Sequence, residues 1–428
     1  MLTVTALSAG PVAAAPGAGA RTGAYEVTSA VAHEVVSEAV HAGAGHACSP
    51  SLSIRGYSDH LDKATFQNTY VGNLSALAVD TDGTLAALSD RSKLFSLDQA
   101  SRRPVRVRSL ADEKGGELDA EGLVVERSGR YLVTSETEPS VRRYERDGRL
   151  LGRLPVPDML RVAPAGRARD NQTFEGLTRR GRTVIASMEG ALTGDGADGA
   201  GRPLVRFQTW QQRTGHGGHG VHRVGGGARA HGHGLGGRAG GRATPTAGDH
   251  DRVADRDREA AGYRLGAQYA YPVDKGLGVV ELAAVPDGWL LVLERGFTAG
   301  VGNTVRLYLA DTRRASDVSG VERLPGAVGA ASASDRKGRE GREAREGREG
   351  RDRVRPVTKR LLGDLGRCPS LGAPAKQPQT NPLLDNIEGM TVLGRAPGGR
   401  LRLLLVSDDN ERATQITRLY EMTVRVGR

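Results

Sequence analysis

The sequence predicts an all-β fold, a β-propeller, from a repeated hairpin pattern, a high glycine content and a scarcity of aromatic residues. Glycine accounts for 60 of the 428 residues and aromatic side chains for 4%, which favours many turns and short strands over long helices. Each hairpin has a short strand, a turn rich in Asp, Gly or Arg, and a second apolar strand that ends in an acidic residue. The pattern occurs in residues 73–91, 119–136, 173–190, 278–296 and 386–410.

These hairpins predict the innermost strands of propeller blades, because a propeller repeats one small sheet around a central channel. Segments between them, such as residues 140–157 and 303–311, are candidates for the outer strands. The turn density and the β-branched content argue against helical alternatives. We expect six blades, with seven as the alternative.

Two low-complexity insertions interrupt the predicted propeller, at residues 211–262 and 330–356. The first is rich in Gly, His and Arg, holds six of the ten histidines, and lies where a blade needs an outer strand. It cannot bury enough apolar surface to offset its ordering entropy, so we expect a disordered segment, although its histidines could bind metal adventitiously. The second repeats a charged triplet whose period gives neither a helix nor a strand a buried face.

Charge and hydropathy narrow the classes of partner. The net charge is +10, but the segments 207–262 and 335–355 contribute +6 of it, and no aromatic-interleaved basic strand or basic helix is present. We therefore expect no nucleic-acid partner. No apolar run approaches the ~20 residues that a membrane span requires, so we expect no integral membrane span. We also expect one propeller domain, residues 48–428, and a monomeric protein.

Residues 1–47 predict a leader and a flexible N-terminus. The small residues around "VAAAP" are typical of a secretory signal peptide with an A-x-A cleavage site, although the first basic residue is Arg21. Either the true start lies upstream or this is a small-residue tail. In an oxidising compartment Cys48 and Cys368 could pair and join the two ends of the fold; the alternative is two unrelated thiols. We expect a secreted protein.

The acidic residues of the hairpins predict a cluster in the central channel, because the ends of innermost strands face the funnel mouths. The second strands end at Asp90, Glu136, Glu189, Glu294, and Asp408 with Asp409. The first strands begin at Glu121, Glu175 and Glu388, while Ser75 and Val280 occupy the same slot in the other two hairpins. Converging carboxylates repel one another unless protons, arginines or a cation intervene, and clusters of oxygen ligands suit calcium.

Other interpretations of these acids stay open. Arg91 and Arg295 follow acidic positions directly and could neutralise them. The acids could also cap turns or pair with arginines between blades, since clusters of this kind are often structural ion-pair networks.

The motifs "ELDAEGLVVE", "NQTFEGLT" and "LLDNIEGMTV" occur in order along the chain. They resemble the phytase-like family, which is often described as having esterase-like activity, and the resemblance covers roughly residues 50–428 without the two insertions. It implies a β-propeller, an exported bacterial protein and a hydrolase of phosphoric or carboxylic esters. The chain departs from the pattern at Ser75, and at Val280, where Glu281 is shifted by one position.

A serine-histidine mechanism lacks its base within the repeated core. No G-x-S-x-G elbow occurs, and outside the low-complexity segment the only histidines precede the repeats: His33, His41, His46 and His60. We therefore expect a water activated by a carboxylate-bound metal ion, with calcium as the cofactor and a small-molecule ester or phosphate as the substrate.

The expected roles divide three ways. The metal ligands are Glu121, Glu175, Glu388 and Asp408. The catalytic residues are Glu136, Glu189 and Asp409, and the substrate-binding residues are Arg91 and Arg295. Two alternatives stay open: a non-catalytic extracellular propeller that binds a ligand or partner at its funnel, and a lactonase-like propeller hydrolase.

Overall fold

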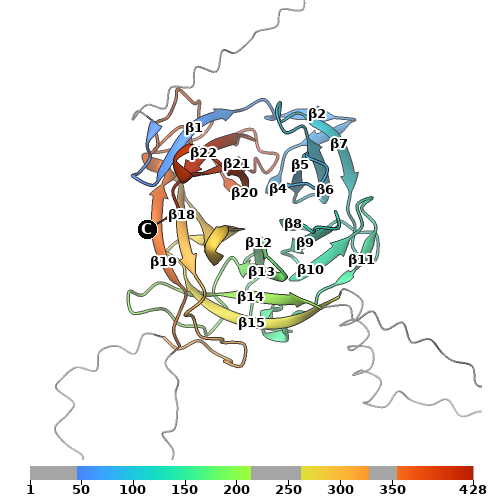
Figure 1. Cartoon of the computed structure of the whole chain (residues 1–428), viewed down its shortest axis with the longest axis vertical. Helices are drawn as coiled ribbons and strands as arrows, with labels where there is room; N and C mark the ends of the chain where they lie inside the picture. Colours follow the sequence, from blue (N-terminus) through green and yellow to red (C-terminus); the bar gives the residue numbers. More distant parts are fainter. Residues whose placement is uncertain (1–45, 214–261, 327–353, 428) are drawn as a thin grey trace, which may run out of the picture. The chain divides into compact units, whose positions relative to one another are not determined.

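The computed structural model describes residues 46–213, 262–326 and 354–427, all within one compact unit, Ala44–Arg428. Its strands form five four-stranded antiparallel sheets and one two-stranded hairpin. Figure 1 shows the five sheets arranged as blades around a central opening, with β4, β8, β12 and β20 nearest the centre. The prediction of an all-β propeller is confirmed, and the predicted number of six or seven blades is wrong, because the described residues form five.

The strands run from the centre outwards in each blade. The first blade comprises β4 (Leu74–Val79), β5 (Leu85–Ser89), β6 (Lys93–Leu97) and β7 (Pro104–Ser109). The second comprises β8 (Ala120–Val125), β9 (Tyr131–Ser135), β10 (Ser140–Tyr144) and β11 (Leu150–Arg153). The third comprises β12 (Phe174–Arg180), β13 (Thr183–Met188), β14 (Leu204–Gln212) and β15 (Tyr263–Pro272).

The fourth blade comprises β16 (Gly278–Ala284), β17 (Leu290–Thr298), β18 (Gly302–Asp311) and β19 (Thr358–Asp364). The fifth comprises β20 (Ile387–Arg395), β21 (Leu401–Ser407), β22 (Leu419–Val424) and β1 (Leu52–Ser58). The extra hairpin is β2 (Ala64–Phe66) and β3 (Thr69–Val71). Short 3-10 helices occur at Asp158–Leu160, Pro286–Gly288, Leu365–Arg367 and Pro397–Gly399.

The strand β1 closes the ring. It comes from the N-terminal side of the chain and pairs antiparallel with β22, so that Leu52 lies opposite Val424 and Ser58 opposite Leu419. The fifth hairpin of the sequence therefore completes its blade with the first strand of the chain. Each recognised hairpin accounts for one blade, and the remaining length lies in the β2–β3 hairpin, in long connections such as 154–173, and in the two insertions.

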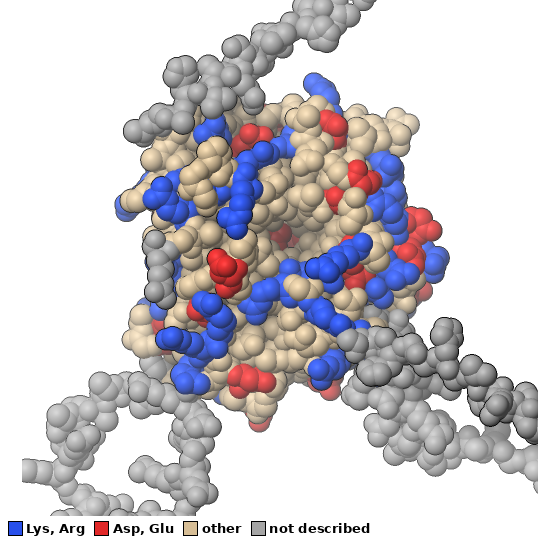
Figure 2. All heavy atoms as spheres, in the orientation of Figure 1, with Lys and Arg blue, Asp and Glu red and all other residues tan. Residues whose placement is uncertain are grey.

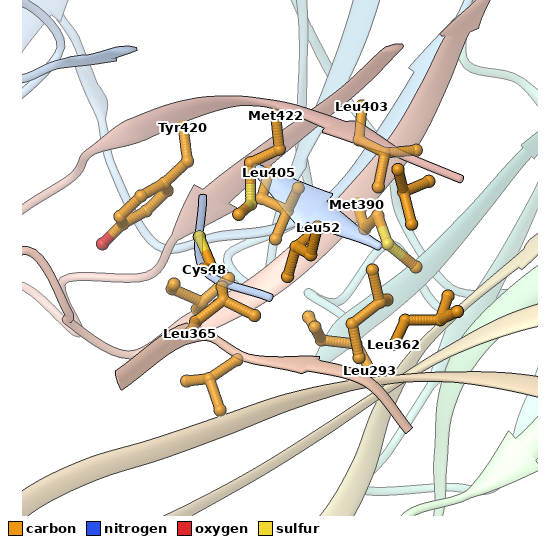
Figure 3. Close-up of a cluster of buried hydrophobic side chains, with 14 of the residues drawn as sticks. Cys48, Leu52, Leu293, Leu362, Leu365, Met390, Leu403, Leu405, Tyr420 and Met422 are labelled. Carbon is orange, nitrogen blue, oxygen red and sulfur yellow. The ribbon is translucent and has the colours of Figure 1, made fainter. Parts of the chain in front are cut away.

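A disulfide and an apolar cluster reinforce this closure. Cys48 and Cys368, which are 320 positions apart, are bonded to each other, and no free cysteine remains. Figure 3 shows Cys48 and Leu52 packed with Met390, Leu405 and other side chains of the fourth and fifth blades. The first of the two alternatives for the cysteines is therefore the one observed.

The first insertion leaves the third blade complete. Strand β14 extends to Gln212, β15 begins at Tyr263, and these two residues pair with each other. The segment thus connects the third and fourth strands of its blade instead of replacing one. The second insertion occupies the same kind of position, between β18 and β19. At its start the first predicted insertion is wrong, because Gln211 and Gln212 belong to β14. The other predicted disorder falls largely on residues 214–261 and 330–353, which lie outside the described residues, as do residues 1–45 of the predicted leader.

One finding bears on membrane topology. Across residues 46–213, 262–326 and 354–427, no helix has the length and apolar character needed to cross a bilayer.

Reduction of the disulfide tests its contribution to closure. We expect the double substitution Cys48→Ser and Cys368→Ser to lower the free energy of unfolding by about 2–5 kcal/mol, because a cross-link over a long loop restricts the unfolded chain. Urea titrations of the oxidised protein, the reduced protein and the double variant measure the effect. Equal midpoints for all three would show that the pairing of β1 with β22 is sufficient to close the ring.

Candidate functional site

Each of the five innermost strands carries a β-bulge near its start. The pairing register with the second strand shifts by one residue between Leu74 and Ala76 in the first blade, and at the same place in the others. A bulge leaves one extra residue outside the ladder and re-aims its side chain. The residues at the bulges are Ser75, Glu121, Glu175, Val280 and Glu388, which form the first ring of the site.

The glycine that follows the bulged glutamate is required by the close approach of the neighbouring blade. A Cβ atom on Gly122 would lie 2.4 Å from the carbonyl oxygen of Glu175, and one on Gly176 would lie 2.7 Å from the Cα of Glu281. Gly389 is confined in the same way by Val406 and Ala76. The Glu-Gly pair in the motifs thus has two physical roles: the glutamate enters the bulge, and the glycine lets two inner strands meet.

A second ring lies where the second strand of each blade ends. The backbone N–H groups of Asp90, Glu136 and Glu189 donate to the carbonyl oxygens of Asn73, Asp119 and Thr173 at 2.7–2.9 Å. In the fifth blade Asp408 donates to Asn386 at 2.9 Å. In the fourth blade the equivalent pair is Gly278 and Arg295. The second ring is therefore Asp90, Glu136, Glu189, Arg295 and Asp408.

Glu294 had been expected to supply the acid of the fourth blade, but the register excludes it from the funnel. It pairs with Val279, one position before the ring, and its buried carboxylate accepts hydrogen bonds from Tyr271 Oη at 2.6 Å, Lys359 Nζ at 2.5 Å and Asp274 N at 3.0 Å. Successive side chains of a strand point to opposite faces. Arg295 therefore takes the ring position, and Glu294 becomes part of a structural ion-pair network.

All members of the two rings except Val280, which is buried in an apolar cluster, line a central cavity of about 300 Å³. In Figure 2 a hollow lies at the centre of the displayed face, with Lys and Arg side chains around its rim and acidic atoms inside. Of the predicted site residues, seven line the cavity: Glu121, Glu136, Glu175, Glu189, Glu388, Asp408 and Arg295. Asp90 of the first blade, an acidic strand end expected in the cluster, also lines the cavity. The structure thus brings together most of the predicted cluster, with contributions from all five blades.

Two predicted site residues lie elsewhere. Asp409 is buried, and its carboxylate accepts hydrogen bonds from Lys63 Nζ, Tyr70 Oη and the backbone N–H of Asn73. These bonds outweigh burial and lower the pKa of Asp409, so it anchors the β2–β3 hairpin as a carboxylate. The Arg91 side chain is 62% exposed, with its Nε 3.9 Å from Asp90 Oδ1, and it is not among the cavity-lining residues.

Two groups of carboxylates converge closely enough to share a cation. One ligand oxygen from each of Asp119, Glu121 and Glu136 lies within 4.8 Å of the other two, and Glu136, Glu175 and Glu189 form a second such group. Glu136 belongs to both. Sequence reasoning missed Asp119, although it stands directly before the second hairpin's first strand, opposite Glu136. Asn386, whose Nδ2 donates to Glu388 Oε1 at 3.0 Å, was missed as well.

Burial and mutual repulsion raise the pKa values of these acids. Burial raises the pKa of Glu136 to about 7, with further contributions from Glu189 and Asp119. Burial, and then the charge of Glu388, raise the pKa of Glu121 well above its ordinary value. Burial, and then the charge of Glu121, raise the pKa of Glu175 in the same way. The cluster therefore holds protons near neutral pH unless a cation takes their place.

Around Asp90 the same effects operate. Burial, and then the charge of Asp408, raise the pKa of Asp90 to about 7. The pKa of Asp408 itself rises to about 6, because burial outweighs the hydrogen bond from Asn410 and the charge of Arg295.

Arg295 is the positive charge within this acidic ring. Its Nη2 donates to Glu388 Oε1 at 2.9 Å, and its charge opposes the effect of burial on the pKa of Glu388 and Glu189. Its buried Nε has no acceptor in the part of the chain that the structure describes. This arginine thus neutralises part of the ring and retains a donor for a further partner.

The chemistry of the donor set fits a hard divalent cation. The ligand atoms are carboxylate oxygens, which calcium and magnesium prefer. In addition, Ser75 Oγ, on a residue that is 3% exposed, and Asp90 Oδ1 are buried and have no hydrogen-bond partner among the described residues. Both residues line the cavity. Unpaired buried oxygens of this kind are costly unless a cation or water satisfies them.

Comparison with known proteins gives one family. Residues 69–237 and 237–411 match the family described as "Phytase-like: Esterase-like activity of phytase". An "Uncharacterized secreted protein" of Arthroderma benhamiae is 29% identical over 106 residues, which are 18% of this chain and 21% of that protein. The chain therefore spans about a fifth of the length of this relative.

Two solved structures illustrate the structural similarities. Myxococcus xanthus glutaminyl cyclase is 13% identical, with a TM-score of 0.35, over 88% of this chain and 97% of the other. A streptogramin B lyase is 9% identical, with a TM-score of 0.31, over 83% and 94%. At these TM-scores neither similarity bears on the chemistry of the funnel.

Substitution of the glycine between two inner strands tests the packing that supports the rings. We expect Gly176→Ala to lower the free energy of unfolding by about 1–3 kcal/mol, because the new Cβ overlaps the backbone of Glu281. The control is Gly199→Ala, where a Cβ meets nothing within 4 Å and the change should stay within about 0.5 kcal/mol. Chemical denaturation measures both, and equal effects would contradict the close packing.

The raised pKa values predict how stability depends on pH without metal. A carboxyl whose pKa is higher in the folded state keeps its proton longer there, so the free energy of unfolding falls as pH rises from about 5 to about 8. The pKa of Glu136 rises from 4.5 to about 7 in the folded protein, and a difference of one in pKa corresponds to about 1.4 kcal/mol. We therefore expect the free energy of unfolding to fall by a few kcal/mol over this interval.

Thermal unfolding in the presence of a chelator measures this loss. Glu136→Gln should flatten the profile, whereas Glu117→Gln, at a side chain that is 63% exposed, should leave it unchanged. A melting temperature of the parent protein that is constant or rises over this interval contradicts the assignment.

Proposed function

The chain belongs to the phytase-like family, and on that premise we propose that it is a metal-assisted hydrolase of phosphate or simple esters that acts in the central funnel. The observation that carries the proposal is the position of Glu136, which belongs to two groups of three carboxylates. In each group, one oxygen of every carboxylate lies within 4.8 Å of the other two. Such a site holds cations and acid–base groups together, which is what hydrolysis by an activated water requires.

The ligands would come from neighbouring blades. Asp119 and Glu121 of the second blade and Glu175 of the third lie around Glu136, while Glu388 and Asp408 extend the carboxylate ring into the fifth blade. A bound calcium ion would polarise the ester and acidify a water molecule. The bulges hold the glutamates on β-strands instead of mobile loops, so their carboxylates are positioned before substrate arrives.

Glu136 and Glu189 are the candidates for proton transfer. Without a cation, burial and the neighbouring carboxylates raise the pKa of Glu136 to about 7. A bound cation would lower this pKa, so Glu136 would be deprotonated and able to accept a proton from water. In hydrolysis the base takes a proton from water as the oxygen attacks phosphorus or the carbonyl carbon, and the leaving oxygen receives a proton as its bond breaks. Two neighbouring carboxyls with different surroundings can divide these roles.

Positive side chains would orient an anionic substrate in an acidic funnel. Arg295 keeps its Nε–H without an acceptor among the described residues, and the exposed Arg412 also lines the cavity. An arginine can donate two parallel hydrogen bonds to a phosphate or carboxylate. Arg295 thus supports the substrate-binding role expected from the sequence, while the exposed position of Arg91 gives that role no support.

Export is part of the proposal. The bond between Cys48 and Cys368 is of the kind that persists in oxidising compartments, and the relative from Arthroderma benhamiae carries the word secreted in its name. We infer that the protein works outside the cytoplasm. That it works as a monomer stays a prediction.

Activity assays with and without metal test the hydrolase. Phytate, an aryl phosphate, an aryl carboxylic ester and a lactone are offered to the full chain with calcium and with chelator. We expect turnover of a phosphate or simple ester that chelation abolishes, and a fall in kcat of at least about 100-fold in Glu136→Gln, the range for loss of an acid–base group. Glu117→Gln is the matched control.

The remaining outcomes separate the alternatives. Activity that survives the double substitution Glu121→Ala and Glu175→Ala would exclude the proposed site. Turnover of the lactone alone would favour a lactonase-like hydrolase. No turnover of any ester, together with a rise in melting temperature on adding calcium, would favour a non-catalytic binding propeller.

A further inference from the structure

A second cavity, of about 600 Å³, lies at the hairpin turns of the second and third blades. Six arginines and a single acidic residue, Glu126, line it; the arginines are Arg127, Arg130, Arg143, Arg179, Arg182 and Arg213. We call it the arginine cleft. Its side chains come from the β8–β9 turn, from β10, from the end of β12 and the β12–β13 turn, and from the end of β14 with the residue that follows it.

The arginine cleft is separate from the acidic funnel. Glu121 stands at the start of β8, whereas Glu126 and Arg127 follow the end of the same strand. Six residues of strand span roughly 20 Å. The funnel residues and the arginines therefore occupy opposite ends of the inner hairpins, and the two lining sets have no residue in common.

Within residues 46–213, 262–326 and 354–427, negative charge does not balance these arginines. Both oxygens of the buried Glu126 are occupied, Oε2 by Arg143 Nε at 2.8 Å and Oε1 by Tyr263 Oη at 2.5 Å. Arg130 forms its ion pair with Glu145, at 2.8 Å. Two further arginines donate to neutral acceptors: Arg179 to Gln212 Oε1 at 3.1 Å, and Arg182 to Gln212 O at 2.7 Å.

Unused donors remain in the cleft. The Nε of Arg179 is buried and has no acceptor within the described ranges. Arg127 and Arg213 are exposed at its edge. Like charges that converge in a cavity repel one another unless an anion is bound, and a buried donor without a partner is rare unless it serves a ligand.

We propose that the arginine cleft binds a small anion that carries several phosphate or sulfate groups. Guanidinium groups recognise such groups through paired, charge-assisted hydrogen bonds, and the volume of the cleft falls in the range of small-molecule sites. This binding is independent of catalysis in the funnel. Occupation of the cleft would neutralise the excess positive charge and join the turns of two blades.

Titration calorimetry on the full-length, metal-free chain tests the proposal with inorganic tripolyphosphate, sulfate and citrate. The test variant is the double substitution Arg127→Ser and Arg213→Ser, which removes two exposed charges. The control is Arg55→Ser with Arg103→Ser, two exposed arginines that do not line the cleft. Both variants lose the same net charge, and their melting temperatures establish that they are folded.

We expect tripolyphosphate to bind with a stoichiometry of one, more tightly than sulfate or citrate. The dissociation constant should rise about tenfold or more in the test variant and less than about twofold in the control, because charge-assisted contacts are lost only in the former. Glu136→Gln should bind tripolyphosphate with the affinity of the parent protein, so that binding in the cleft can be judged whether or not the funnel proves to be a hydrolase site. Equal weakening in the two double variants, or no binding by the parent, would overturn the proposal.

A short single-stranded oligonucleotide provides the last comparison. If it binds more tightly than tripolyphosphate and loses affinity in the test variant alone, the occupant is a nucleic-acid backbone, and the proposal of a small anion is wrong.

Discussion

The close approach of neighbouring inner strands is the constraint on which the rest of the structure depends. A side chain at Gly122 or Gly176 would collide with the next blade, and one at Gly389 would meet Val406 of its own blade and Ala76 of the next. Each of these glycines directly follows a glutamate at a β-bulge. The bulge turns the glutamate side chain towards the centre, and the glycine lets the neighbouring strand approach closely. These two adjacent residues form one local structural unit. Its repetition in the second, third and fifth blades brings Glu121, Glu175 and Glu388 to the centre and lets the inner strands pack closely there.

This arrangement concentrates an electrostatic cost at the centre of the fold. Burial and repulsion raise the pKa values of Glu121, Glu136 and Glu175, so without a cation the charged cluster destabilises the folded state. The apolar clusters between blades, the pairing of β1 with β22 and the disulfide of Cys48 stabilise the ring against it. Functional sites commonly carry such local costs, which the surrounding structure offsets.

The two ends of the inner hairpins have opposite electrostatic character. Strand starts and ends bring carboxylates into the funnel, whereas the turns of the second and third blades gather arginines around Glu126. An inner strand of only six residues, such as β8, thus connects an acidic and a basic site. The net charge of the chain conceals this separation, because it sums over both faces and over the insertions.

The repeat of hairpins by itself determined the all-β propeller, the five inner hairpins and the convergence of Glu121, Glu136, Glu175, Glu189, Glu388 and Asp408, since strand ends of a repeated unit must meet at its axis. Only the tertiary structure decided the blade count, because the closing strand β1 carries no repeat signal of its own. It also decided that Arg295 instead of Glu294 faces the funnel, and that Asp409 turns to Lys63 and Tyr70. A shift of one residue moves a side chain to the other face of a strand, and both the bulges that set this register and the contacts between distant segments arise only when the blades pack together.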